Sequence, residues 1–354
     1  KVGIINMKIG TITFHWVTNY GAVLQSFALQ KALIEMGVNT EIIDYKPRKM
    51  LIINKLSNLK HGNISSLKKE FNINKFRKKE LILSKNKYWT YDQLKKIKNE
   101  YKGVIVGSDQ IWNEWFTLHG EGKITKSYFL DFLPNKVKKF SYAASFGCES
   151  TTPEYNSIVK SSLSSFDRIS VRENTGVDII REFGLNSELV CDPTLLLTVN
   201  EYKKLIKNNK KNCKFFPYII NGNQQNAIDI YNYLNNKYSD CMENYKFDFG
   251  IYEWLQYIHD SKFVVTNSFH GVVFCLLFNT DFIPVLIKGS GMNDRIITLL
   301  KMVNLEDRIL TEFDNNKVDM IYGKRINWEN VNKKIDIFRN KSLDFLNECI
   351  QEIE

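Results

Sequence analysis

Short buried-strand patterns alternate with helix patterns over almost the whole of this sequence. The run KVGIINMKIG at residues 1–10 has the character of a strand, and residues 22–37 follow after a polar loop with apolar side chains at helical spacing. The alternation continues through residue 270, where KFVV is followed by HGVVFCLLF. Strands that alternate with helices in this way form parallel sheets covered by helices on both faces. The sequence therefore predicts an α/β protein.

The chain of 354 residues is long for a single hydrophobic core, so we expect two domains. The alternation is interrupted by VNEYKKLIKNNKKNC, a polar and lysine-rich stretch that is typical of a domain boundary. We predict an N-terminal Rossmann-like domain at residues 1–198 and a C-terminal one at residues 199–326. A long polar helix is expected over residues 327–354.

A histidine stands at one of the predicted turns from a strand into a helix. His270 follows the strand pattern FVVTN and directly precedes the run GVVFCLLF. In open α/β sheets, ligands bind beyond the carboxyl ends of the strands, where unpaired helix amides and the helix dipole attract anions. We interpret His270 as part of such a site, against the alternatives that it caps the helix or packs in the core. Ser268 is a candidate for the cap itself.

Other predicted strand ends carry polar clusters of the same kind. Asp109 follows the strand pattern GVIV after a Gly-Ser pair, and it is a candidate base as well as an ordinary helix cap. Arg172 in SVRE has two interpretations, a buried ion pair that holds the domain or a clamp for a ligand carboxylate. Asp192-Pro193 is interpreted as a turn at the end of the domain. The further loop candidates are Asn19, Tyr20, Gly21, Ser108, Gln110, Ser145 and Gly147.

Several common site motifs are absent from the sequence. No GxGxxG follows the first strand pattern, and there is neither a GxxxxGK phosphate loop nor a GxSxG nucleophile elbow. The sequence contains no Asp-x-Asp, no HExxH and no CxxC, and its six cysteines and five histidines are scattered. We therefore expect no cofactor, no metal site and a reducing, cytoplasmic environment.

The formal net charge of +10 and the isoelectric point near 9.1 favour anionic partners. Basic residues concentrate in residues 46–102, where we expect a largely helical insertion that is either a solvated face or a contact for anionic lipid headgroups. No zinc-finger, RNA-binding or basic-heptad pattern accompanies it, so nucleic acid is not favoured. Apolar runs such as VVFCLLF are too short to cross a bilayer, and no secretion leader is expected.

Eight motifs, in the order in which they occur along the chain, indicate that the sequence resembles a known family. The sequence contains NYGAVLQSFALQKAL, IIDYKP, VGSDQIWN, YFLDF, SYAASFG, SVREN, CDPTLLL and TNSFHGVVF between Val2 and about Arg308. Together they closely resemble the polysaccharide pyruvyl transferase family. The resemblance implies two facing Rossmann-like domains, as in the GT-B class of glycosyltransferases, with the active site in the cleft between them. It also implies that pyruvate passes from phosphoenolpyruvate to a sugar of a cell-surface polysaccharide or its lipid-linked precursor, leaving a cyclic ketal.

The resemblance assigns roles to the candidate residues. Asp109 and His270 become the acid and base of ketal formation, with His270 on the donor side and the loop candidates on the acceptor side. In the family the histidine motif typically has arginine and leucine before the histidine, whereas Phe269 stands directly before His270 here. Lys288 and Arg295 are candidates to supply the missing charge. The donor-binding candidates are Asn267, Ser268, Gly271, Lys288 and Arg295.

Two other functions remain open. One is a metal-independent glycosyltransferase that uses a nucleotide-sugar donor in the same two-domain frame. The other is a non-catalytic module of a polymer-assembly complex. A transferase that used lipid-linked acceptors would act at the inner face of the membrane as a peripheral protein, which fits the basic segment 46–102.

Overall fold

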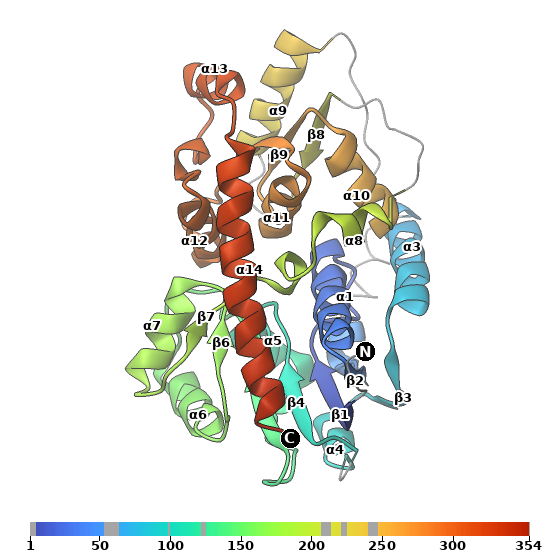
Figure 1. Cartoon of the computed structure of the whole chain (residues 1–354). Helices are drawn as coiled ribbons and strands as arrows, with labels where there is room; N and C mark the ends of the chain where they lie inside the picture. Colours follow the sequence, from blue (N-terminus) through green and yellow to red (C-terminus); the bar gives the residue numbers. More distant parts are fainter. Residues whose placement is uncertain are drawn as a thin grey trace. The chain divides into compact units, whose positions relative to one another are not determined.

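The computed structural model describes residues 5–52, 64–97, 100–121, 125–206, 214–220, 225–239 and 247–353 (Figure 1). The chain divides into two compact units, and each is described by itself below. The N-terminal unit consists of Lys1–Leu197 with Phe338–Glu354, and the C-terminal unit is Thr198–Ile337. The long final helix α14 (Trp328–Gln351) therefore does not stand apart from the two units, because residues 328–337 belong to one and residues 338–351 to the other.

The N-terminal unit is built on a parallel sheet with the strand order β3-β2-β1-β4-β5. Two short strands, β6 and β7, continue the sheet beyond β5 through parallel bridges at Phe140–Arg168 and Ala144–Val171. This is the doubly wound Rossmann order, in which the chain reverses direction across the sheet between β1 and β4. The strands are β1 (Ile5–Ile12), β2 (Val38–Tyr45), β3 (Leu83–Tyr88), β4 (Gly103–Val106), β5 (Lys138–Ser141), β6 (Ser170–Val171) and β7 (Glu188–Leu189).

Helix α1 (Tyr20–Glu35) is the most deeply embedded helix of those described in this unit. Its residues from Tyr20 to Gln30 are all buried, which explains why apolar and small side chains occur on every face. The other helical segments include α3 (Ile64–Glu80), α4 (Tyr91–Leu94), α5 (Glu114–Glu121), η1 (Ser127–Phe129), α6 (Pro153–Leu163), α7 (Asn174–Glu182) and η2 (Pro193–Leu195).

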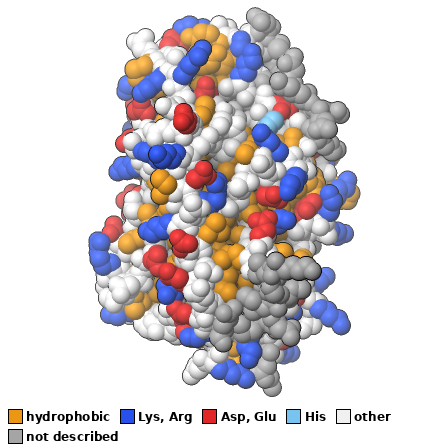
Figure 2. Space-filling view, viewed as in Figure 1, with side chains coloured by type: hydrophobic (Ala, Val, Ile, Leu, Met, Phe, Trp, Pro, Cys, Tyr) orange, Lys and Arg blue, Asp and Glu red, His pale blue; other side chains and the backbone are white. Residues whose placement is uncertain are grey.

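The basic segment 46–102 contains a strand of the main sheet, which corrects the expectation of a largely helical insertion. β3 pairs in parallel with β2, and α3 buries Ile73, Phe76 and Arg77. Residues 53–63 and 98–99 of the segment lie outside the described residues. On the face that Figure 2 shows, lysine and arginine side chains are interspersed with aspartate and glutamate.

The C-terminal part of α14 is held to the rest of the N-terminal unit by hydrogen bonds and ion pairs. Ser342 accepts a hydrogen bond at Oγ from the amide of Cys191, at 2.9 Å. Arg168, which lies just before β6, donates to the carboxylates of Glu348 and Glu352 at 2.6 and 2.5 Å. These contacts attach the helix beside β6 and β7.

The C-terminal unit contains a second parallel sheet with the order β10-β9-β8. Helix α11 is apolar apart from His270, and all of its residues except the last are buried. The strands are β8 (Phe215–Tyr218), β9 (Phe263–Thr266) and β10 (Asp281–Pro284). The helical segments are α8 (Val199–Lys203), α9 (Gln225–Tyr238), α10 (Ile251–Asp260), α11 (Phe269–Phe278), η3 (Gly291–Asn293), α12 (Asp294–Val303), η4 (Glu306–Arg308) and α13 (Asn315–Gly323). Within the part of the chain that the structure describes, no helix is long and apolar enough to span a membrane.

Candidate functional site

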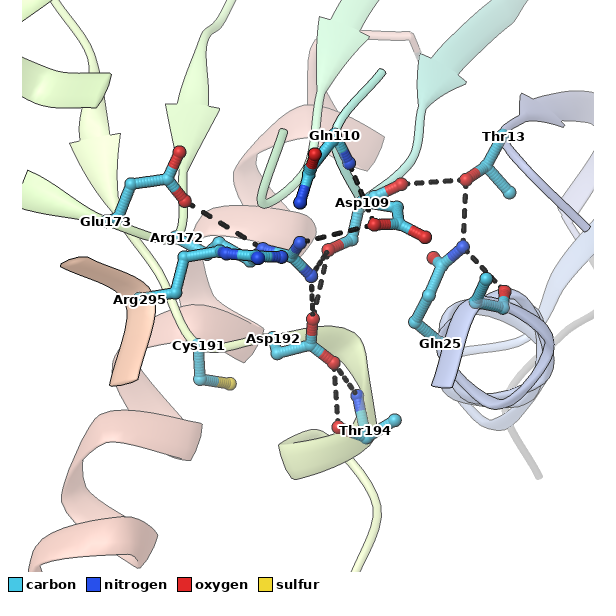
Figure 3. A network of polar contacts seen from close by, with 12 residues as sticks. Thr13, Gln25, Asp109, Gln110, Arg172, Glu173, Cys191, Asp192, Thr194 and Arg295 are labelled. Carbon is cyan, nitrogen blue, oxygen red and sulfur yellow. Dashed lines mark hydrogen bonds and ion pairs between the residues drawn. The ribbon is translucent and has the colours of Figure 1, made fainter. Parts of the chain in front are cut away.

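The loops that follow β1 and β4 are joined by a hydrogen bond at the point where the strand order reverses. Thr13 donates from Oγ1 to the carbonyl oxygen of Ser108 at 2.8 Å. Gln25 of α1 in turn donates to Thr13 Oγ1, also at 2.8 Å (Figure 3). Open parallel sheets bind their ligands at this reversal, beyond the carboxyl ends of the strands. The candidate site of the N-terminal unit is therefore built on the residues next to Ser108.

Asp109 has a backbone conformation that residues other than glycine seldom adopt. Its φ angle is 83°, in the region that favours glycine. The conformation is fixed because the carbonyl oxygen of Asp109 accepts from the amides of Ile111 and Ser145, at 2.8 and 3.1 Å. The carboxylate accepts at Oδ1 from the amide of Gln110 at 2.9 Å, and the side chain is 17% exposed. Backbone strain of this kind clusters at functional sites. Asp109 therefore offers a rigidly held, accessible carboxylate.

Arg172 lies behind this carboxylate in a buried network (Figure 3). Its Nη1 donates to Asp192 Oδ2 at 2.6 Å and to Ser108 Oγ at 3.0 Å, and its Nη2 lies 3.4 Å from Asp109 Oδ1. Burial opposes the charged form, yet the carboxylates of Asp192, Asp109 and Glu173 hold the pKa of Arg172 above its ordinary value. Its side chain has no exposed surface, so the geometry is that of the buried ion pair and not of a direct clamp on a ligand.

Asp192 is a member of this network that the sequence did not reveal, because Asp192-Pro193 looks like a simple turn. Its Oδ1 accepts from the amide and the hydroxyl of Thr194, at 3.1 and 2.7 Å, and so caps η2. Its Oδ2 accepts from Arg172 and from the hydroxyl of Ser108. One carboxylate thus joins the turn after β7 to the loops after β4 and β6.

The other loop candidates in this unit mainly shape the backbone. Gly147 has a φ of 63°, and a Cβ there would lie 2.7 Å from the side chain of Gln110. Ser145 is buried and binds Asp109 through its amide. Asn19 caps α1 by accepting from the amide of Ala22 at 3.1 Å, and the two residues after it, Tyr20 and Gly21, are buried.

A second polar group, which sequence reasoning missed, lies at the carboxyl ends of β1 and β2. The Nε2 of His15 donates to Oδ1 of Asp44 at 3.0 Å, and Lys46 reaches the same oxygen at 3.0 Å. Both His15 and Asp44 are almost completely buried. Burial is the largest effect on the imidazole, and it lowers the pKa of His15 although Asp44 acts in the opposite direction.

In the C-terminal unit, the turn from β9 into α11 is fixed by its own side chains. Thr266 donates from Oγ1 to the carbonyl of Tyr218 at 2.6 Å and accepts from the amide of Ser268. Ser268 then caps α11 by accepting from the amide of Gly271 at 3.3 Å. Asn267 exchanges two hydrogen bonds with the backbone of Ile220, at 2.7 and 2.9 Å. Asn267, Ser268 and Gly271 therefore build the turn on which His270 stands.

His270 is the second residue of α11 and is 7% exposed. Its ring lies 5.2 Å from the ring of Phe269 between centroids. Arg295 of α12 places its guanidinium carbon 5.6 Å from the centroid of the same Phe269 ring, which brings a cation to this turn. Lys288 lies at the surface instead, where it pairs with Glu312 at 3.3 Å. Of the two basic candidates, Arg295 is the one placed beside the histidine motif.

Among the residues that the structure describes, no group of histidine, cysteine and acidic side chains is arranged to hold a metal ion. The described cysteines are the free thiols Cys148, Cys191, Cys275 and Cys349. Burial raises the pKa of Cys148 and of Cys191 to about 11, so neither thiol is activated as a nucleophile.

The model of the family described as polysaccharide pyruvyl transferase matches residues 19–289. The chain belongs to the polysaccharide pyruvyl transferase family. The match includes Asp109, Arg172 and His270, and it confirms the resemblance carried by the sequence motifs. None of the curated proteins matches this pyruvyl transferase family member in sequence.

Solved structures with a similar fold include two UDP-N-acetylglucosamine 2-epimerases and a protein solved with UDP. The UDP-GlcNAc 2-epimerase from Methanocaldococcus jannaschii has a TM-score of 0.53 at 11% identity, with 91% of this chain and 93% of that chain covered. A putative UDP-N-acetylglucosamine 2-epimerase from Listeria monocytogenes has a TM-score of 0.51 at 8% identity, covering 93% and 90%. The S. aureus MnaA-UDP co-structure has a TM-score of 0.50 at 15% identity, also covering 93% and 90%. At these sequence identities the likeness shows the fold alone. It confirms the GT-B-like fold class that was predicted for this chain.

Proposed function

We propose that this protein transfers pyruvate from phosphoenolpyruvate to two hydroxyl groups of one sugar, forming a cyclic ketal. The observation that carries the proposal is the family match over residues 19–289, which includes Asp109 and His270. The sugar belongs to a cell-surface polysaccharide or to its lipid-linked precursor. No resident cofactor enters the proposed reaction.

The reaction needs one proton acceptor and one proton donor. A sugar hydroxyl attacks C2 of phosphoenolpyruvate and loses its proton, while C3 gains a proton and becomes a methyl group. The bond between C2 and the phosphate oxygen then breaks, and inorganic phosphate leaves with the electron pair. A second hydroxyl bonds to C2, and its proton leaves with the phosphate. General acid–base catalysis by positioned side chains suits both proton transfers.

The geometry supports a division of roles between two residues. Asp109 has an accessible carboxylate held by the backbone and by Arg172, so we assign it to the proton of the acceptor hydroxyl. His270 stands in the first turn of α11, where the helix dipole is positive, and Arg295 adds a cation over the ring of the neighbouring Phe269. Phosphoenolpyruvate carries a carboxylate and a phosphate, which such a turn attracts. We therefore assign His270 to the donor and to the proton delivered to C3. Arg172 is a positioning residue.

The test begins with ligand binding and turnover of the whole chain. Phosphoenolpyruvate should raise the melting temperature, and incubation with a panel of methyl hexopyranosides and hexose 1-phosphates should release phosphate in equal amount to ketal. His270→Ala should reduce turnover on the order of a hundredfold or more, the scale for losing a positioned acid or base. His270→Gln should keep donor binding, because an amide still donates a hydrogen bond but transfers no proton.

The matched control is His259→Gln in α10, because that imidazole pairs with Asp260 and is one third exposed. It should leave turnover unchanged. Stabilisation and sugar transfer with nucleotide sugars, but not with phosphoenolpyruvate, would replace the proposal by a glycosyltransferase. A chain that responds to neither class of donor would be a non-catalytic module of an assembly complex.

A further inference from the structure

Helix α3, which comes from the basic segment, packs on the loop that leads from β1 into α1. The ring of Phe76 lies 5.6 Å from that of Phe27 in α1, in an edge-to-face arrangement. The next residue, Arg77, donates from Nη2 to the carbonyl oxygen of Val17 in the loop and from Nη1 to Asn74 at 2.6 Å. α3 is therefore fixed against the start of α1, which contains acceptor-side candidates of the sequence analysis.

Lys69 lies about two helical turns before Phe76 and Arg77 on α3. Its ammonium nitrogen stands 4.3 Å from the centroid of the Tyr20 ring, and Tyr20 is the first residue of α1. No carboxylate among the described residues pairs with Lys69, and burial alone lowers its pKa to about 8. The side chain is nevertheless only partly buried, so a ligand has access to it.

Around Lys69, basic side chains outnumber acidic ones. Lys69, Arg77 and Lys46 all lie around the same loop. Of the carboxylates nearby, Glu70 acts on Arg77, and Asp44 is shared between Lys46 and His15. A partly desolvated ammonium without a counter-charge is unfavourable, and an anionic ligand would relieve that cost. Other lysines of α3 such as Lys78 are exposed to water and have no such need.

We propose that Lys69 binds a phosphate group carried by the acceptor sugar, beside Tyr20 at the start of α1. This inference rests on the proposed function, because it assigns a chemical class to the acceptor of that reaction. It makes α3 a part of the acceptor site and gives the basic segment a substrate-binding role. Lys69 sets specificity for charged acceptors and takes no part in the bond changes at C2 and C3.

The experiment compares Lys69→Met with Lys69→Arg in the whole chain. Methionine keeps an apolar stem over Tyr20 and removes the charge, whereas arginine keeps the charge. With hexose 1-phosphates as acceptors, Lys69→Met should raise KM about tenfold or more, the scale of one lost charge-assisted hydrogen bond. With methyl hexopyranosides its KM should stay as in the wild type. Lys69→Arg should stay within a few-fold for both acceptors, and the control Lys78→Met should match the wild type.

Three outcomes would overturn the inference. An equal rise in the KM of Lys69→Met for both acceptors would make Lys69 a structural residue. An unchanged KM for both acceptors would make it a solvated residue without a role in binding. Weaker binding of Lys69→Met to phosphatidylglycerol vesicles, with an unchanged KM for hexose 1-phosphates, would assign the lysine to a membrane surface.

A direct binding measurement separates this inference from the proposed function. Hexose 1-phosphates should raise the melting temperature of the wild type and of Lys78→Met but not of Lys69→Met. That difference would support the Lys69 site even if no pyruvate were transferred from phosphoenolpyruvate. Equal stabilisation of all three proteins would overturn the Lys69 site while leaving the proposed function untouched.

Discussion

Arg172 and Asp192 form a 2.6 Å ion pair between Nη1 and Oδ2, and neither side chain has any exposed surface. Arg172 directly follows β6, and Asp192 lies three residues after β7. Each of these strands has only two residues, so few backbone hydrogen bonds hold this edge of the sheet. The buried pair compensates for the short strands and also sets the guanidinium behind Asp109.

Breaking this pair should destabilise the protein strongly. Asp192→Asn leaves the guanidinium of Arg172 buried without its nearest carboxylate, at a cost of about 3–5 kcal/mol for an uncompensated buried charge. Urea denaturation would measure the loss. Arg181→Ala is the control, because Arg181 forms a 2.6 Å pair with Asp178 in which both side chains are mostly exposed. That control should change stability by about 0–1 kcal/mol, and equal effects of the two substitutions would show that the buried network is not structural.

Substitutions at Asp109 separate the cost of its backbone strain from the loss of its carboxylate in catalysis. Glycine adopts a φ of 83° freely, whereas alanine does not, so Asp109→Gly should be more stable than Asp109→Ala by about 1 kcal/mol. Asparagine also tolerates this region. Asp109→Asn should therefore fold like the wild type yet lose turnover on the order of a hundredfold or more. Retained turnover in the asparagine variant would remove Asp109 from the role of base.

The sequence predicts those parts of the fold that depend on local pattern. A long polar helix is expected over residues 327–354, and α14 spans Trp328–Gln351. The strand before His270 and the helix after it are also where the pattern places them. By contrast, β3 was missed because LSKNKY is a largely polar edge strand, whose pairing with β2 decides its conformation.

The polar networks could not be predicted from the sequence, because they depend on contacts between distant residues. His15 and Asp44 are 29 residues apart, and only the parallel pairing of β1 and β2 brings them together. The sequence left two interpretations of Arg172 open, and the partner that decides between them, Asp192, is 20 residues away. Strand-end position predicts where a ligand would bind, but it gave no information on which side chains meet.

Gly271 is expected to be required for the turn that holds His270. A Cβ at this position would lie 2.4 Å from Thr266 Oγ1 and 3.0 Å from the ring of Tyr218. Gly271→Ala should therefore cost about 1–3 kcal/mol through overpacking and should weaken phosphoenolpyruvate binding by displacing the start of α11. Gly323→Ala at the end of α13 is the control, because an added Cβ there meets no atom within 4 Å. Thermal unfolding measures both, and equal melting temperatures would contradict the close packing at Thr266.

His15 should make stability depend on pH below neutrality. Because burial lowers the pKa of His15 in the folded protein, the unfolded chain takes up a proton on this residue at a higher pH than the folded chain does. The unfolded state therefore binds more protons as the pH falls below about 6.5, the ordinary histidine value, and folding stability decreases in that direction. The urea midpoint should fall between pH 7 and pH 5, and the fall should be smaller in His15→Gln. The control is His259→Gln, because the imidazole of His259 is one third exposed in the wild type. This variant should keep the slope of the wild type. If His15→Gln had the steeper slope instead, the ion pair with Asp44 would outweigh burial and the imidazole would be charged in the folded protein.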